Sequence, residues 1–234
     1  IDKKYFNDNV TVDELMDYSM MVVDATKDIA AAYKPNLAFF EEWGSKGYYW
    51  LENLMNHIGS SHIVIADAKR GDIGNTGLHY ANAFFNHFNC DAITVSPYMG
   101  KESIEPFVSN ASKGAFVLCR TSNESSTFIQ EDIFSKVITL CEELNLKQNI
   151  GLVVGATNDD AMMKVRSSTD LPFLIPGIGA QGGDLKSVLK MNKNHLNTTL
   201  INISRGIIFA GNKDFDSIRN SAKKYLNQIR ESDG

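Results

Sequence analysis

Cysteine is scarce in this sequence, and the histidines follow no metal-binding spacing. The chain has three cysteines, Cys90, Cys119 and Cys141, which are far apart and form no CxxC pair. This argues against a disulfide framework and a structural zinc site, and it favours a reducing, cytoplasmic compartment. Cys119 ends an apolar run and is interpreted as a core residue. No HExxH motif occurs, and His79 and His87 are interpreted as surface or packing residues rather than ligands.

Long hydrophobic runs and an excess of positive charge are also missing. No apolar segment approaches the roughly 20 residues that a membrane span needs, and the opening Ile1-Asp-Lys-Lys does not have the pattern of a signal peptide. The net charge of −5 argues against a nucleic-acid partner or an anionic membrane surface. Because no low-complexity segment, charge block or Pro/Gly/Ser-rich linker interrupts the chain, residues 1–234 are predicted to form one domain.

The sequence does contain a regular alternation of helical stretches with short apolar runs. Strictly alternating βα units with uniformly apolar strands are typical of a parallel sheet covered by helices, so an α/β protein is predicted. The predicted strands are residues 30–34, 63–67, 92–96, 115–119, 150–154, 173–175 and 199–203. Predicted helices include residues 12–29, with Thr11 as N-cap, and residues 75–88, 102–109 and 159–166. A helical region before His57 is expected to break near Gly44.

Two architectures fit this alternation. A closed (β/α)₈ TIM barrel requires a strand before the opening helix, whereas an open doubly wound sheet does not. The phosphate-binding signals described below favour the barrel. On that interpretation, the chain begins inside the first unit and its first strand is missing.

The most informative segment is residues 63–76, in which an apolar strand ends in three charges, Asp67, Lys69 and Asp72. Alternate side chains on a strand share a face, so Asp67 and Lys69 are expected on one side of its C-terminal end. A strand end that carries both signs is suited to placing charge against a ligand. A structural ion pair beside a turn is the alternative.

A second strand end adds Lys34 and Asn36, which are also two residues apart. Catalytic groups of a barrel lie at the C-terminal ends of its strands. Two ammoniums, Lys34 and Lys69, and two carboxylates, Asp67 and Asp72, are therefore predicted to form an alternating array, although Lys34 alone would suit a solvated position before a turn. A Mg²⁺ site on the two aspartates is the competing interpretation, but the lysine between them competes for the same charge.

A phosphate site is predicted at the other end of the chain. The loop from Pro176 to Asp184 contains four glycines, which allow the backbone to approach an anion closely. Asp184 is expected to cap the next helix, and Arg205 follows the last strand near the start of another helix. Such loops and a helix N-terminus form the usual phosphate site of these barrels, with Arg205 and Gln181 as donors. A flexible surface turn, with Gln181 as a solvated tip, is the alternative.

Together these motifs resemble the orotidine 5'-monophosphate decarboxylase family over essentially the whole chain. The matching segments, in family order, are Tyr33-Lys34-Pro-Asn36, Asp67-Ala-Lys69-Arg-Gly-Asp72-Ile73 with Thr76, Thr121-Ser122-Asn123, Pro176-Gly-Ile-Gly-Ala-Gln181-Gly-Gly-Asp184 and Arg205. The resemblance implies a homodimeric (β/α)₈ barrel with shared active sites. It also implies decarboxylation of orotidine 5'-monophosphate to uridine 5'-monophosphate, the last step of pyrimidine biosynthesis, without a cofactor or metal.

The resemblance also implies roles for individual residues. Lys69 corresponds to the proton donor beside C6 of the pyrimidine, Asp67 lies near the departing carboxylate, and Lys34 binds the ribose and orders the charges. Asp72 completes the catalytic set and reaches the neighbouring subunit's site. The residues implied to bind substrate are Asn36, Ile73, Thr76, Ser122, Pro176, Gln181 and Arg205; of these, Ile73 and Thr76 act across the dimer, Ser122 at the pyrimidine edge, and Gln181 and Arg205 on the phosphate.

One position departs from the family pattern, and two other functions compete. The family's first strand carries a ribose-contacting aspartate that nothing before Thr11 supplies, since Asp2 and Asp8 lie in the wrong context. Mg²⁺-dependent sugar-phosphate decarboxylases and aldol enzymes share the Asp-x-Lys-x-x-Asp segment, but Lys34 argues against them. A non-catalytic phosphate-binding barrel would have little reason to retain costly clustered charges.

Overall fold

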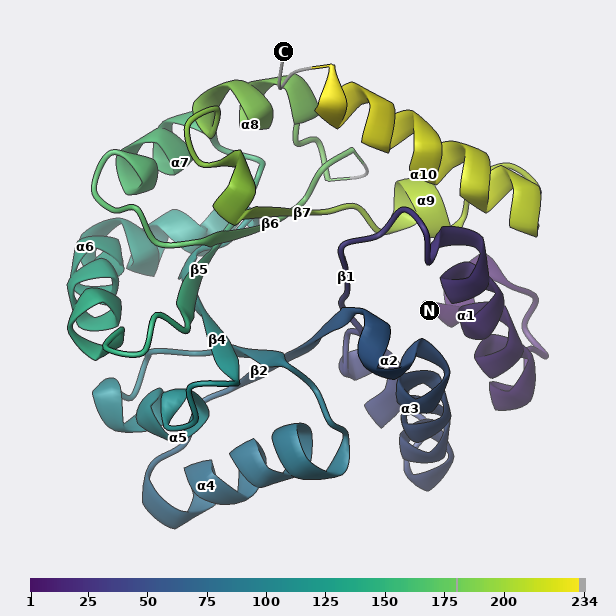
Figure 1. Ribbon diagram of the computed structural model, residues 1–234, viewed down its shortest axis with the longest axis horizontal. Coiled ribbons are helices and arrows are strands. Elements are labelled where there is room, and N and C mark those ends of the chain that lie inside the picture. Colours follow the sequence, from purple (N-terminus) through teal and green to yellow (C-terminus); the bar gives the residue numbers. More distant parts are fainter. Residues whose placement is uncertain (180, 232–234) are drawn as a thin grey trace.

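Seven parallel strands form one curled sheet, surrounded by helices in the computed structural model, which describes residues 1–179 and 181–231 (Figure 1). The strands are β1 (Ala32–Tyr33), β2 (Ile63–Arg70), β3 (Ala92–Val95), β4 (Gly114–Arg120), β5 (Ile150–Val154), β6 (Phe173–Pro176) and β7 (Thr199–Asn202). Each strand pairs in parallel with the next one along the chain. This is the predicted α/β barrel without its first strand. Residues 1–11 contribute a 3₁₀ turn at Lys3–Tyr5 and no strand, so the sheet has seven strands.

Helices connect the strands and cover the outer face of the sheet (Figure 1). They are α1 (Val12–Thr26), α2 (Ala38–Glu41), α3 (Ser45–Ile58), α4 (Gly74–Asn82), α5 (Glu105–Val108), α6 (Thr127–Leu144), α7 (Asp159–Arg166), α8 (Leu185–Met191), α9 (Arg205–Ile208) and α10 (Phe215–Arg230). Further 3₁₀ turns lie at Gly59–Ser61, Lys101–Ser103, Glu124–Ser126 and Leu196–Thr198, and a π-helical turn at Ala83–His87.

Local sequence signals account for several helix boundaries. Thr11 begins α1 with the predicted cap, which is a full capping box: its hydroxyl accepts from Glu14 N, and Glu14 accepts from Thr11 N at 2.8 Å. Gly44, at φ +56°, separates α2 from α3 at the predicted break. The bounds of β5 and α7 are those predicted from the sequence.

Other boundaries differ from the prediction. β1 has two residues instead of five, and α1 ends at Thr26 rather than at residue 29. The predicted helix over residues 75–88 divides into α4 and the π-helical turn, in which Phe88 N donates to Ala83 O at 3.0 Å. β2 continues to Arg70, three residues beyond the predicted end at Asp67.

The two faces of the sheet have separate apolar clusters. Strand residues of one face pack with the helices in the main core, whereas Ile65, Ala92, Val153 and Leu174 form a second cluster made of strand residues alone. Because side chains alternate along a strand, this second cluster marks the face that points into the barrel. Residues that lie two positions beyond a member of this cluster, at the end of a strand, therefore also point inward.

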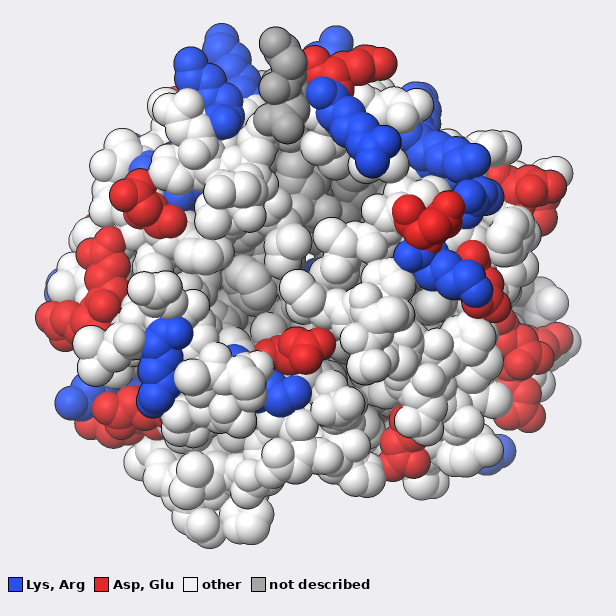
Figure 2. Space-filling view, viewed as in Figure 1, with Lys and Arg blue, Asp and Glu red and all other residues white. Residues whose placement is uncertain are grey.

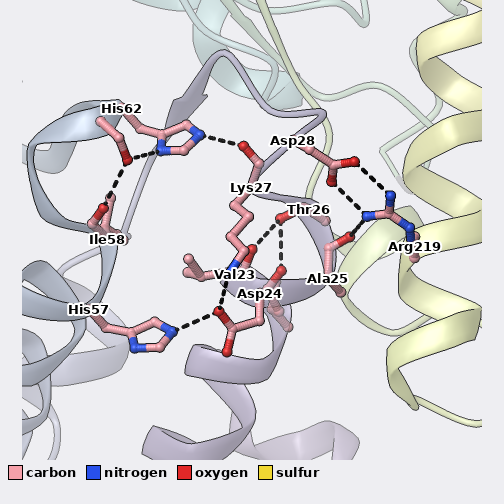
Figure 3. Close-up of polar contacts among 12 residues, drawn as sticks. Val23, Asp24, Ala25, Thr26, Lys27, Asp28, His57, Ile58, His62 and Arg219 are labelled. Atoms are coloured by element: carbon pink, nitrogen blue, oxygen red, sulfur yellow. Dashed lines mark hydrogen bonds and ion pairs between the residues drawn. The ribbon is translucent and has the colours of Figure 1, made fainter.

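Among the described residues, β1 and β7 do not pair with each other, so the sheet is open between them. Polar contacts join the end of α1 and the segment after it to the neighbouring helices on both sides of this opening (Figure 3). Arg219 of α10 donates to both carboxylate oxygens of Asp28 at 2.6 Å. On the other side, His57 of α3 lies 3.2 Å from Asp24, and His62 Nε2 lies 2.7 Å from Lys27 O. These contacts lie where α1 leads into β1, at the N-terminal end of the strands.

Candidate active site

Three neighbouring strands bring polar side chains to the same inner rim. Lys34, Asp67 and Thr94 each stand two residues after a member of the inner apolar cluster on β1, β2 and β3. Since alternate residues share a face, all three side chains point toward the inside of the barrel at the C-terminal ends of the strands. Viewed in the direction of Figure 1, the surface has a hollow at the centre of the ring of helices (Figure 2).

Asp67 lies between two lysines. Its Oδ2 accepts from Lys34 Nζ at 2.5 Å, and its Oδ1 accepts from Lys69 Nζ at 2.5 Å. Burial raises the pKa of the Asp67 carboxyl, but the ammonium groups of Lys34 and Lys69 outweigh burial and hold this pKa below its usual value. Asp67 is 9% exposed, whereas the Lys69 side chain is 51% exposed. Two lysines thus face one carboxylate, and the surplus positive charge lies at Lys69, where a ligand can reach it.

The backbone turns sharply at Lys69. This residue has φ +49°, and the pairing of β2 with β3 shifts register between Ala66 and Arg70. A left-handed conformation at a residue other than glycine costs on the order of 1 kcal/mol and is typical of functional sites. Lys69 N donates to Thr94 Oγ1 at 2.9 Å. The predicted proximity of Asp67 and Lys69 is confirmed, and it occurs at this bulge.

The other residues predicted at this rim, including the fourth charge, Asp72, make no side-chain hydrogen bond or ion pair with Asp67. Asn36 pairs with Asp67 only through the backbone, and its side chain accepts from Ala38 N at 3.1 Å. Asp72 accepts from Ile73 N at 2.8 Å, and no hydrogen bond or ion pair joins it to Lys34 or Lys69, which both pair with Asp67. Ile73 and Thr76 are exposed near the start of α4. The single chain therefore joins three of the four predicted charges.

The glycine-rich loop after β6 folds back on itself. Gly183 N donates to Gly177 O at 3.0 Å, and Gly179 N donates to Gly183 O at 2.9 Å; Ala180 lies outside the described residues. A Cβ on Gly183 would come within 2.6 Å of Ala156 Cβ, so this position requires glycine. As predicted, Asp184 caps α8, accepting from Ser187 N at 2.8 Å.

Two loops that are far apart in the sequence meet at Gln181. Ser122 Oγ, after β4, donates to Gln181 Oε1 at 2.9 Å. Gln130 of α6 holds the preceding residue, since Thr121 N donates to Gln130 Oε1 at 2.8 Å. The structure thus brings together the residue expected at the pyrimidine edge and one expected at the phosphate, while Pro176 ends β6 beneath the same loop.

Arg205 is the first residue of α9, as predicted near a helix start, and its side chain makes no hydrogen bond or ion pair with the described residues. Tyr225 of α10 was not predicted. Its Oη would be 2.7 Å from a Cβ on Gly206 and 3.5 Å from one on Gly179, so it lies between the glycine loop and α9. Thr94 was also missed; the only signal in the sequence was a polar residue inside an apolar strand.

Other expectations concern groups outside this rim. In residues 1–179 and 181–231, no three His, Cys, Asp or Glu side chains are grouped so as to hold a metal ion. No helix in the same ranges is long and apolar enough to cross a membrane. Burial raises the pKa of the Cys119 thiol to about 12, and its position in the main core confirms the interpretation from sequence.

Comparisons with known proteins agree with these features. The model of the orotidine 5'-phosphate decarboxylase / HUMPS family matches residues 8–216. An orotidine 5'-phosphate decarboxylase of Dehalococcoides mccartyi is 43% identical over 207 residues, which cover 83% of this chain and 77% of that protein.

Solved structures give the same result. The structure of Leishmania donovani OMP decarboxylase has a TM-score of 0.87 and 36% identity, covering 98% of this chain and 92% of that one. The structure of Leishmania donovani UMP synthase has a TM-score of 0.89 and 38% identity; the match covers 97% of this chain but spans only 52% of that longer chain. The chain therefore belongs to the orotidine 5'-phosphate decarboxylase / HUMPS family.

Proposed function

We propose that this protein is a carboxy-lyase that converts orotidine 5'-monophosphate to uridine 5'-monophosphate and CO₂, in pyrimidine biosynthesis. The observation that carries the proposal is the buried Asp67 carboxylate held between Lys34 and Lys69. Family membership supplies the substrate class, and the surplus positive charge at this rim supplies a chemical reason for the reaction.

Loss of CO₂ from C6 leaves an electron pair in the plane of the pyrimidine ring, perpendicular to its π system. The ring cannot delocalise this pair, so the protein must stabilise it with fixed charges. The half-exposed ammonium of Lys69 is suited to that task. The C6–carboxylate bond breaks, the electron pair stays on C6, and Lys69 Nζ gives C6 a proton.

The other residues are assigned by their places around the rim. Asp67 lies against the departing carboxylate and orients Lys69, while Lys34 reaches the ribose, with Asn36 beside it. On the opposite side, Ser122 contacts the pyrimidine edge. The backbone of the loop that begins at Pro176 binds the phosphate, together with the side chains of Gln181 and Arg205. The phosphate supplies binding energy remote from C6.

We also propose a homodimer whose sites are shared between subunits, with Asp72, Ile73 and Thr76 reaching the neighbouring site. Apolar side chains at α4 support this interface, since Ile73, just before the helix, and Leu78, within it, are each 48% exposed. The three buried, free cysteines suit a reducing cytoplasm.

Loss of orotidine 5'-monophosphate absorbance, with and without EDTA, tests the function. We expect turnover that EDTA does not change. Lys69→Ala should lower kcat by at least about 10²-fold, the usual contribution of a positioned proton donor, and keep uridine monophosphate affinity within a few-fold. Activity that EDTA abolishes and Mg²⁺ restores would instead indicate the metal-dependent relatives. Nucleotide binding without turnover would indicate a non-catalytic barrel.

A further inference from the structure

Thr94 lies beneath the charged rim and contacts both members of its central pair. Its hydroxyl donates to Asp67 Oδ1 at 3.2 Å and accepts from Lys69 N at 2.9 Å. Thr94 is 2% exposed, so substrate at the rim has almost no access to it. Any influence of Thr94 on the reaction must therefore pass through the two residues above it.

The direction of these hydrogen bonds follows from the groups involved. A backbone N–H can only donate, so Lys69 N occupies a lone pair of the threonine oxygen. The single hydroxyl proton then points to Asp67, which as a carboxylate can only accept. One hydroxyl thereby links the carboxylate of β2 to the backbone of the residue that carries the reactive ammonium.

The same hydroxyl supports an unfavourable backbone conformation. Lys69 has φ +49° at the register shift between β2 and β3. Such a conformation persists only where surrounding contacts determine it. Without the Thr94 oxygen, the Lys69 N–H would lose the partner that holds this turn, and the lysine would be free to leave its place over Asp67.

We propose that Thr94 is a positioning residue that sets the Lys69 ammonium against Asp67 and thereby controls kcat. The inference rests on the proposed function, in which Lys69 is the proton donor. It adds a residue from β3 to a site otherwise formed here by the ends of β1 and β2 and by the loops after β4, β6 and β7.

Four variants test this role, with kcat, KM and melting temperature measured for each. Thr94→Ala and Thr94→Val remove the hydroxyl, and each should lower kcat about 10- to 100-fold, the range expected for a lost hydrogen bond to a charged group. KM should stay within about threefold. Thr94→Ser has lost the same methyl group as Thr94→Ala but keeps the oxygen, and it should retain kcat within about threefold. Thr26→Val removes another buried hydroxyl, which donates to Val22 O and does not bind Asp67 or either lysine. This variant should leave kcat unchanged.

A double-mutant cycle distinguishes positioning from general support of the fold. In a Lys69→Ala background, Thr94→Ala should lower the residual kcat less than about threefold, because the residue it positions is already gone. Equal kcat values for Thr94→Ser and Thr94→Ala would overturn the proposal, as would an effect of Thr94→Ala on kcat that is just as large in the Lys69→Ala background. If Thr94→Val does not fold, the comparison of Thr94→Ser with Thr94→Ala still decides. If the wild-type protein does not decarboxylate the nucleotide, the proposed function fails before any variant is compared.

Discussion

At the residue scale, the environment of Asp67 decides what the site can bind. Each carboxylate oxygen accepts from a lysine Nζ at 2.5 Å, so both are already paired with positive charge. Breaking one such buried pair leaves an uncompensated charge, which is strongly destabilising. A divalent cation on Asp67 would have to displace a lysine, whereas the surplus charge at Lys69 would attract the carboxylate and the C6 carbanion of the proposed reaction.

Arg205 gives a prediction at the same scale. Arg205→Ala should lower kcat/KM for orotidine 5'-monophosphate roughly 10- to 10²-fold, the cost of losing charge-assisted hydrogen bonds to phosphate. The rate of the slow reaction of orotidine, which lacks the phosphate, should change less than about threefold. The melting temperature should stay the same, because the side chain makes no hydrogen bond or ion pair with the described residues. Arg230→Ala, at the exposed end of α10, is the control. Equal losses on both substrates would assign Arg205 a structural role.

At the scale of elements, apolar runs and caps predicted most of the fold. β5 and α7 have their predicted bounds because a continuous apolar run and an Asn158 cap define them locally. The extension of β2 was not predictable, because it depends on the left-handed Lys69 and on Ser96 N, which donates to Arg70 O at 2.7 Å. The π-helical turn likewise interrupts a pattern that continues as a helix in the sequence.

The site was predictable only where it lies at strand ends. Lys34, Asp67 and Lys69 are charges that follow apolar runs, and this position alone indicates a ligand-binding rim. Thr94 and Tyr225 were missed because their roles depend on which elements become neighbours. Thr94 matters because β3 lies beside β2, and Tyr225 because α10 passes both the glycine loop and α9.

The ion pair between Arg219 of α10 and Asp28, in the segment that follows α1, gives a prediction at the scale of elements. Hydrogen bonds from Arg219 lower the pKa of Asp28 to about 2, against an ordinary value of 3.8. A carboxyl whose folded-state pKa is depressed stabilises the protein above its unfolded pKa and loses this contribution as the pH falls through the folded pKa. Asp28→Asn should therefore lower the melting temperature by at most a few degrees near neutral pH, since the pair is exposed.

The difference between wild type and Asp28→Asn should shrink as the pH falls below about 4, and added salt should reduce it at every pH. Thermal unfolding of both proteins from about pH 7 to about pH 3 measures it. Asp8→Asn, at an exposed aspartate without an ion pair in the described structure, is the matched control. A difference that stayed constant with pH would show that the Asp28 charge does not fasten α1 to α10.

At the scale of the whole molecule, side chains complete what strand pairing leaves open. β1 and β7 do not pair with each other among the described residues. Across this opening, Tyr5 stacks on Phe209 at 4.1 Å between ring centroids, and Tyr18 donates to Ile208 O at the end of α9. The helix that begins with Arg205 is thus held by residues from the start of the chain, so the position of the proposed phosphate-binding residue Arg205 depends on this closure.

The proposed dimer gives the last prediction, because Asp72 does not reach the array of its own chain. Lys69→Ala and Asp72→Ala homodimers should each be nearly inactive, since every site lacks one member. Subunit exchange produces mixed dimers in which one site carries both defects and the other draws Lys69 and Asp72 from different chains. That second site is native. Random reassortment makes half of the dimers mixed, so about a quarter of wild-type activity should return.

Differently tagged chains and native mass spectrometry would establish that exchange has taken place before activity is measured. Mixing Lys69→Ala with Lys69→Gln is the control, because no reassortment of these chains creates a site with Lys69. Activity should then stay at the level of the separate variants. If the Lys69→Ala and Asp72→Ala mixture also failed to recover after proven exchange, Asp72 would act within its own subunit. The carboxylate and its loop would then have to move toward Lys69 when substrate binds.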